Sequence, residues 1–172
     1  MSKLLIVIDM QNDFITGSLG SVQAQAIVPS VRAKIDAYKQ AGDKIIFTRD
    51  THFGDYLQTQ EGRMLPIVHC IAGTDGHKIA EELDTDDCEI FDKTSFGSLA
   101  LAEHIEETTH GVNEIELIGL CSDICVVSNA LILKAQFPET AITVDSQCCA
   151  GVTEESHNAA LLILKACQVG VT

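Results

Sequence analysis

Glu114-Ile115-Glu116-Leu117-Ile118-Gly119-Leu120-Cys121-Ser122-Asp123-Ile124-Cys125 joins an apolar run to a short turn that ends in a cysteine. The run Ile115–Ile118 predicts a buried strand, and Val126–Ala135 predicts the helix after it. Cys125 would then lie in the first turn of that helix, close to unpaired backbone N–H groups and to the positive end of the helix dipole. That position favours the thiolate, which is the nucleophilic form of cysteine.

Two charged residues elsewhere follow apolar segments in the same way. Asp9 ends the run Leu4–Ile8, and Lys93 follows Ile90–Phe91. If these segments are neighbouring parallel strands, Asp9, Lys93 and Cys125 meet at the carboxyl ends of the strands, where open α/β sheets place their chemistry. Each residue alone is more often structural, so the prediction depends on all three together.

A cysteine that attacks an amide needs a proton acceptor, an oxyanion hole and a donor for the leaving nitrogen. No histidine follows any of the three strands, so Asp9 is predicted to be the base that later returns the proton to ammonia. Lys93 would favour the ionised forms of Asp9 and Cys125. The backbone N–H groups of Cys121 and Cys125 would form the oxyanion hole.

The rest of the chain alternates between predicted strands and predicted helices. Loops are expected at 11–23 and 49–75, and the second is long enough to suggest a functional loop. The alternation predicts one domain, residues 1–172, with a doubly wound α/β fold: a mostly parallel sheet covered by helices on both faces. Strands are predicted at Leu4–Asp9, Asp43–Thr48, Glu89–Asp92, Glu114–Gly119, Ala141–Val144 and Gln168–Val171, and helices at Pro29–Gln40, His77–Leu83, Ser98–Glu107, Val126–Ala135 and after Thr153, the last with Ala159, Leu162, Ile163 and Ala166 on one face.

The long loop carries a second group of polar residues. Asp50 and His52 follow the strand 43–48, and Glu61 and His69 come later in the same loop. One or two carboxylates with two imidazoles suit Zn²⁺, Fe²⁺ or Mn²⁺. The alternative is a polar loop whose histidines form local hydrogen bonds. The other histidines, at 77, 104, 110 and 157, are expected at the surface or at helix ends.

The composition excludes several partners. The formal net charge of −14 repels phosphate backbones and anionic lipid, so neither nucleic acid nor a membrane surface is expected to bind. Seven cysteines in irregular spacing, without a secretory signal, indicate reduced thiols and a cytoplasmic protein.

Together these segments resemble the isochorismatase-like cysteine hydrolase superfamily, and within it the nicotinamidase (pyrazinamidase) branch. The resemblance covers almost the whole chain in the family's order. It is carried by the segments Ile8–Phe14, Asp50–His52, His69–Thr74, Lys93–Phe96 and Gly119–Cys125.

This resemblance implies the triad Asp9, Lys93 and Cys125 and a cis peptide bond between Leu120 and Cys121. It implies a divalent metal, with zinc expected first and iron or manganese as alternatives, and no organic cofactor. The ligands would be Asp50, His52, His69 and, as in some members, Glu61.

The implied reaction is hydrolysis of nicotinamide to nicotinate and ammonia through a thioester on Cys125, in a homo-oligomer (dimer or tetramer). Phe14 and Leu120 would lie beside the substrate. The chain has no tryptophan, and Leu65 or Met64 stands where many members have one. The alternatives are another small amide or an N-carbamoyl compound, isochorismatase-type vinyl-ether hydrolysis, and a catalytically silent protein that binds a metabolite.

Overall fold

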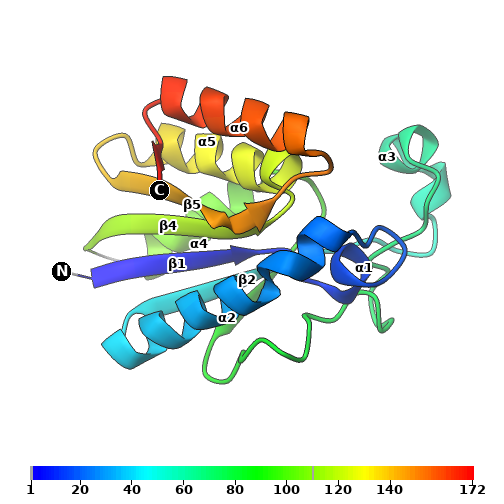
Figure 1. Ribbon diagram of the computed structural model, residues 1–172, viewed down its shortest axis with the longest axis horizontal. Coiled ribbons are helices and arrows are strands. Elements are labelled where there is room, and N and C mark those ends of the chain that lie inside the picture. Colours follow the sequence, from blue (N-terminus) through cyan, green and yellow to red (C-terminus); the bar gives the residue numbers. More distant parts are fainter. Residues whose placement is uncertain (1, 110) are drawn as a thin grey trace.

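Six parallel strands form one sheet, in the order β3-β2-β1-β4-β5-β6, in the computed structural model, which describes residues 2–109 and 111–172 (Figure 1). Each of the five strand pairings is parallel, so the predicted doubly wound fold is confirmed. The strands are β1 Ser2–Ile8, β2 Lys44–Asp50, β3 Glu89–Lys93, β4 Val112–Leu120, β5 Ala141–Ala150 and β6 Gly170–Val171.

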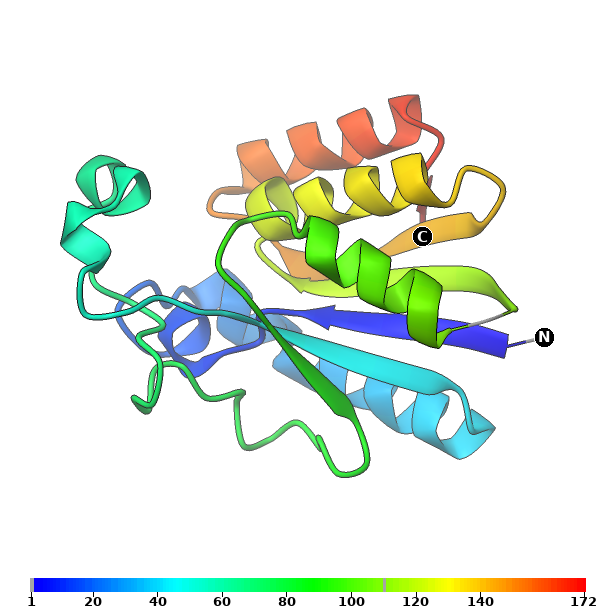
Figure 2. The ribbon, with the colours of Figure 1, turned by 180° about the vertical axis from the view of Figure 1, so that it is seen from behind.

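Helices cover both faces of the sheet. One face packs against α2, and the opposite face packs against α4, α5 and α6 (Figures 1 and 2). The short α3 projects beyond the carboxyl ends of the strands. The helices are α1 Asn12–Ile15, α2 Val22–Ala41, α3 Gln60–Met64, α4 Leu99–Thr108, α5 Val127–Gln136 and α6 Glu154–Ala166, with a 3₁₀ turn at Tyr56–Gln58 and a π-helical turn at Ser122–Val126.

The central strand β1 is buried on both sides. Leu4, Ile6 and Ile8 face the α4 and α5 side, whereas Leu5 and Val7 face α2. Each such side chain contributes roughly 1.5–3 kcal/mol when fully removed from water. This continuous apolar run therefore fixes β1 in the middle of the sheet, and with it the position of Asp9 at the end of the strand.

The order of the strands reverses between β1 and β4. The chain proceeds from β1 outward to β2 and β3, and then crosses back through α4 to β4 on the other side of β1. Close packing at this point requires glycine at 119, because φ is +117° and a Cβ would lie 2.1 Å from the carbonyl oxygen of Ile8. The cis peptide bond between Leu120 and Cys121 follows directly, as the resemblance implied.

The predicted start of α2 at Pro29 is wrong, and the loop expected at 11–23 is confirmed only for residues 16–21, between α1 and α2. The helix begins at Val22, where Ser21 accepts a hydrogen bond from the N–H of Ala24, and Pro29 lies inside it. Proline removes one backbone hydrogen bond from a helix interior. Burial of Ala24 and Ile27 on the sheet offsets that loss.

Two other predictions about helices are corrected by the structure. Residues 77–83 form turns rather than a helix, and Ile79 pairs with Gln11 in an antiparallel bridge. In α6 the core-facing residues are Ala160 and Leu164. The face predicted at 159, 162, 163 and 166 points to solvent.

Among residues 2–109 and 111–172, the helices are too short or too polar to cross a membrane.

A polar cluster joins α2 to the sheet. Lys34 Nζ lies 2.9 Å from both Glu116 of β4 and Asp145 of β5, and the hydroxyl of Tyr38 donates to Glu116 at 2.6 Å. Burial alone would raise the pKa of Asp145, but the hydrogen bonds from Lys34 and from the N–H of Gln147, together with the charge of Lys34, outweigh burial and lower it.

We expect this cluster to stabilise the fold in a pH-dependent way. The pKa of Asp145 is lower in the folded chain, so its contribution is complete above the pKa of the unfolded state and is lost as the pH falls through the folded value. Asp145→Asn should lower the free energy of unfolding by about 1 kcal/mol at neutral pH, and the difference should vanish in acid. Urea denaturation at both pH values measures this, with Asp36→Asn as the control. An equal loss in acid would contradict the assignment.

Candidate active site and metal centre

Three side chains converge where β1, β3 and the π-helical turn end. Lys93 Nζ lies 2.7 Å from Oδ2 of Asp9 and 3.5 Å from Sγ of Cys125. All three are buried, with at most 4% of each residue exposed. The structure therefore brings together the three residues that were predicted from the ends of separate elements.

The ammonium of Lys93 uses its donors on three other atoms. It donates to Oδ1 of Asp50 at 3.4 Å, to the carbonyl of Ser95 at 3.1 Å and to Sγ of Cys125. Oδ2 of Asp9 lies 2.7 Å from Nζ of Lys93, but the angle between them does not suit a hydrogen bond. This buried carboxylate oxygen therefore has no aligned donor. Such an atom can accept a proton from the adjacent thiol.

Burial dominates the electrostatics of this group. It raises the pKa of Asp9, and the charge of Lys93 opposes that rise. Burial alone would lower the pKa of Lys93, but the charges of Asp9, Cys125 and Asp50 raise it above that of an ordinary lysine. Lys93 thus keeps its proton more readily than an ordinary lysine, and Asp9 binds a proton more readily than a solvated aspartate.

The expectation that a helix N-terminus would favour the Cys125 thiolate is wrong for the free protein. Cys125 lies in the π-helical turn Ser122–Val126 that precedes α5. Burial raises the pKa of its thiol, as does the charge of Asp9, and Lys93 only partly compensates. The surroundings of the sulfur therefore favour the thiol over the thiolate, so a nucleophilic role for Cys125 would require a base beside it.

Sequence reasoning missed a residue that orients this base. Thr48 is buried and its hydroxyl donates to Oδ1 of Asp9 at 2.6 Å, while the N–H of Asp9 donates back to Thr48 at 3.2 Å. The opposite oxygen, Oδ2, is thereby turned toward Lys93. A threonine in a buried β-strand gives no distinctive signal in a single sequence.

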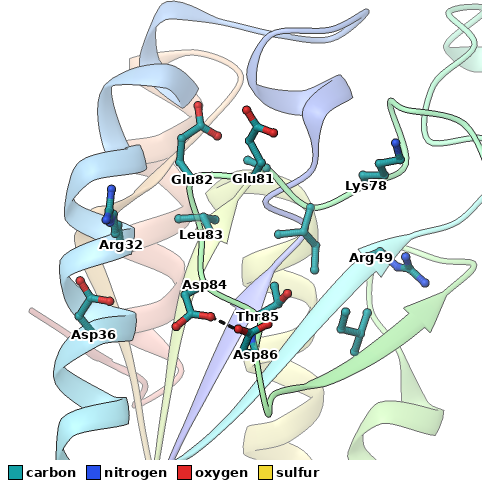
Figure 3. A pocket seen from close by; sticks show the side chains of 13 residues that line it. Arg32, Asp36, Arg49, Lys78, Glu81, Glu82, Leu83, Asp84, Thr85 and Asp86 are labelled. Atoms are coloured by element: carbon teal, nitrogen blue, oxygen red, sulfur yellow. Dashed lines mark hydrogen bonds between the residues drawn. The ribbon is translucent and has the colours of Figure 1, made fainter.

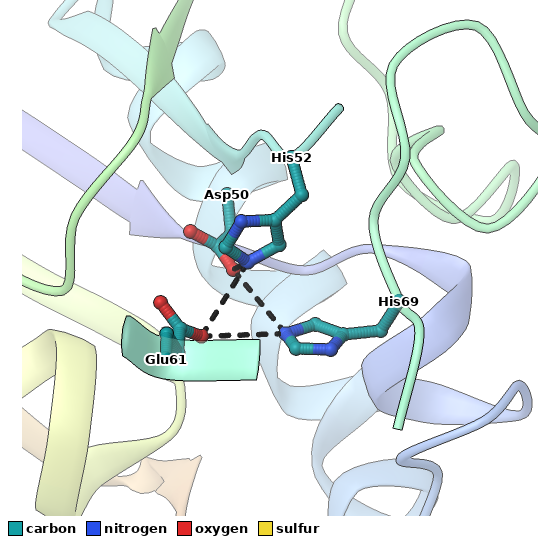
Figure 4. A group of neighbouring side chains, drawn as sticks. All are labelled: Asp50, His52, Glu61 and His69. Carbon is teal, nitrogen blue, oxygen red and sulfur yellow. Dashed lines mark ion pairs between the residues drawn. The ribbon is translucent and has the colours of Figure 1, made fainter. Parts of the chain in front are cut away.

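The four predicted metal ligands also converge (Figure 4). Nε2 of His52 lies 3.0 Å from Asp50 Oδ2 and 3.5 Å from Glu61 Oε1, and Nε2 of His69 lies 3.7 Å from each of those oxygens. Atoms bound tetrahedrally at zinc distances of 2.0–2.1 Å lie about 3.4 Å apart. The spacing in this group therefore fits a divalent cation at its centre.

Hydrogen bonding around the group agrees with that fit. Nδ1 of His69 is 2.8 Å from the carbonyl of Ile67 and must donate to it, which leaves Nε2 as a free acceptor. Nε2 of His52 is buried and not aligned with either nearby carboxylate. Burial would lower the pKa of His52, but the nearby carboxylates of Asp50 and Glu61 raise it to about 9.

A cavity of about 420 Å³ opens onto both groups. Its walls include Cys125 and Cys121, the ligands Asp50, Glu61 and His69, and the apolar side chains of Phe14, Leu65, Leu120 and Val152. Of the two residues considered in place of a tryptophan, Leu65 lines this cavity, whereas Met64 is 81% exposed.

A larger hollow, about 640 Å³, lies between α2 and residues 78–86 (Figure 3). Charged side chains of both signs line it, including Arg32, Arg49, Glu81 and Glu82. It contains neither the cysteine nor the metal ligands, so the smaller cavity is the candidate active site.

The remaining histidines differ from one another. His77, expected at the surface, is buried, and its ring lies 2.8 Å from the hydroxyl of Thr51. His104 is half-buried within α4. His157 lies in the first half of α6, and its Nδ1 is 2.7 Å from the hydroxyl of Ser122. His110 lies outside the described residues.

Comparison with known proteins agrees with this architecture. The isochorismatase domain matches residues 3–172. The chain is 30% identical to a nicotinamidase/pyrazinamidase of Mycobacterium tuberculosis, over 92% of each chain. It is also 30% identical to a probable inactive nicotinamidase of Arabidopsis thaliana, over 94% of this chain and 87% of that one.

Solved structures include a similar protein. The crystal structure of the pyrazinamidase of Pyrococcus horikoshii in complex with zinc aligns with a TM-score of 0.88 at 25% identity, covering 100% of this chain and 99% of that one. The chain belongs to the isochorismatase family. Within that family it is a hydrolase that acts on amide bonds.

The metal centre can be tested without any substrate. Zinc added to metal-stripped protein should raise the melting temperature, because an ion that binds only the folded state stabilises it. Asp50→Asn should remove most of that increase, and Asp55→Asn, an exposed neighbour, should not. Differential scanning calorimetry measures the melting temperatures. An equal zinc-induced increase in native protein and in Asp50→Asn would contradict the ligand assignment.

Proposed function

We propose that this amidase is a nicotinamidase, which hydrolyses nicotinamide to nicotinate and ammonia with Cys125 as nucleophile. The observation that carries the proposal is the position of Lys93 Nζ. It lies within 3.5 Å of the cysteine sulfur, of a buried carboxylate base and of a carboxylate in the metal-ligand group. The nucleophile and three of the four metal ligands line one cavity, and the base Asp9 is buried beside Lys93, next to that cavity. We also propose that residues 1–172 form one hydrolase domain, which the match over 3–172 supports.

The first half of the reaction forms a thioester. Asp9 removes the proton of the Cys125 thiol as the sulfur attacks the carboxamide carbon. Cys121 and Cys125 both line the cavity, and their backbone N–H groups would stabilise the oxyanion. Protonated Asp9 then gives its proton to the departing nitrogen, the C–N bond breaks, and ammonia leaves.

The second half releases the acid. Asp9 takes a proton from water as the water oxygen attacks the thioester carbon. The C–S bond breaks, and the proton returns from Asp9 to the sulfur, so the enzyme regains its starting state. Lys93 keeps its charge throughout and limits the cost of the negative charge that moves between Asp9 and Cys125.

The metal-ligand group and the apolar walls would orient the substrate. Asp50, His52, Glu61 and His69 would hold a divalent cation, which supplies a Lewis-acid contact for a heteroaromatic ring nitrogen. Phe14 lies 5.6 Å, centroid to centroid, from the ring of His69 and would form the aromatic wall. Zinc is the first candidate because it suits mixed imidazole and carboxylate ligands and is the ion in the Pyrococcus structure.

Ammonia release tests the nucleophile. Cys125→Ala should reduce turnover of nicotinamide by roughly 10³-fold or more, because both halves of the reaction need the sulfur. The control is Cys149→Ala, a second buried cysteine, on β5. Equal rates for native protein and Cys125→Ala would rule out this mechanism. Activity on an N-carbamoyl amino acid but not on nicotinamide or pyrazinamide would change the substrate, and no release from any of them would favour a silent binding protein.

The pH profile tests the base. Asp9 must be ionised to accept the thiol proton, and its pKa is raised, so kcat/KM should fall as the pH decreases through a value above the ~3.9 of an ordinary aspartate. The measurement uses saturating zinc, so that loss of the cation does not limit the rate. A profile that stays flat down to about pH 4 would contradict the role of Asp9.

A further inference from the structure

A short segment directly after Asp9 contacts the backbone of the loops that carry the metal ligands. Gln11 precedes α1 and is fully buried. Its Oε1 accepts from the N–H of Asp50 at 2.7 Å, and its Nε2 donates to the carbonyl of Asp50 at 2.9 Å. One amide group thus satisfies both backbone groups of a metal ligand. The same Nε2 donates to the carbonyl of His77 at 3.0 Å, so each amide atom has partners that match its chemistry.

Asp13 makes the corresponding contact to the other loop. Its Oδ2 accepts from the N–H of Cys70 at 2.7 Å, directly after the ligand His69. The adjacent loop fits tightly around this carboxylate, because a Cβ at Gly76 would lie 2.0 Å from Oδ2 of Asp13. The position of Asp13 is therefore fixed from two sides.

The third ligand is tied to the same arrangement through Cys70. The N–H of His52 donates to the carbonyl of Cys70 at 2.9 Å. Asp13 therefore holds Cys70 by accepting from its N–H, and Cys70 in turn holds His52 through its own carbonyl. Two side chains, two residues apart in the sequence, thus set the backbone at Asp50, His52 and His69, whereas Glu61 lies on the projecting α3.

We propose that Gln11 and Asp13 are positioning residues that preorganise three of the four metal ligands. They do not touch the ion themselves. They hold the ligand backbones at a spacing that matches a divalent cation before it binds, so that binding need not order two loops. The inference rests on the metal centre of the proposed function.

Zinc affinity, measured by competition with a chromophoric chelator, tests the proposal independently of activity. Gln11→Met keeps the length of the side chain and removes its hydrogen bonds, and Asp13→Ala removes the acceptor for Cys70. Each should weaken zinc binding about 10- to 100-fold, the usual effect of losing a partner that orients a ligand. Asp13→Asn keeps an acceptor oxygen and should recover most of the affinity.

The matched control is Asn12→Ala. Asn12 lies between the two residues, and its side chain donates to the carbonyl of Asp75, which is not next to a ligand. The zinc affinity of the Asn12→Ala variant should equal that of the native chain. Urea denaturation of the metal-free variants separates a loss of fold from a loss of positioning. The absorption spectrum of the cobalt(II)-loaded proteins adds a readout of ligand geometry, which should change for Gln11→Met and Asp13→Ala only.

The outcomes are distinguishable. Native affinity and native cobalt spectra in both variants would overturn the positioning role and leave the metal centre intact. Failure of the native chain to bind zinc or cobalt would overturn the metal centre and this inference with it. If Gln11→Met does not fold, the comparison of Asp13→Ala with Asp13→Asn decides: equal affinities for the two would overturn the proposal.

Discussion

The site depends on one buried ammonium group, that of Lys93. An isolated lysine at this depth would lose its proton, because burial penalises the charged form. The carboxylates of Asp9 at 2.7 Å and Asp50 at 3.4 Å keep it charged, and the sulfur of Cys125 at 3.5 Å accepts a hydrogen bond from it. The same contacts hold together residues from three parts of the chain. Burial raises the pKa of both Asp9 and Cys125, and the shared cation limits those two rises.

The topology of the sheet explains why these groups can meet. The strand order reverses between β1 and β4, which opens a crevice at the carboxyl ends of both strands. Asp9 follows β1, and the turn that carries Cys125 follows β4 after the close approach at Gly119. The segment after Asp9 then reaches across to β2 and the 69–70 loop through Gln11 and Asp13. One strand end thus organises both the proposed nucleophile and the proposed metal ligands.

Much of this arrangement follows from sequence patterns. Continuous apolar runs predicted the strands, and the triad follows from strand ends because parallel strands finish at one edge. Local patterns failed where distant contacts decide: α2 starts before Pro29 because burial on the sheet offsets one missing hydrogen bond, and 77–83 is held by pairing with Gln11. The pKa of Cys125 was mispredicted because burial depth is not visible in a sequence. The homo-oligomer and the cytoplasmic location stay predictions.

The most direct test of this account measures the electrostatic coupling between Lys93 and Cys125. The rate of Cys125 alkylation, followed by mass spectrometry of its peptide as a function of pH, gives the thiol pKa in metal-stripped native protein and in Lys93→Met. Lys93 is the charge that lowers this pKa against burial and Asp9, so its removal should shift the alkylation profile to higher pH. An unchanged or lower thiol pKa in a folded Lys93→Met variant would contradict the central role of the buried ammonium.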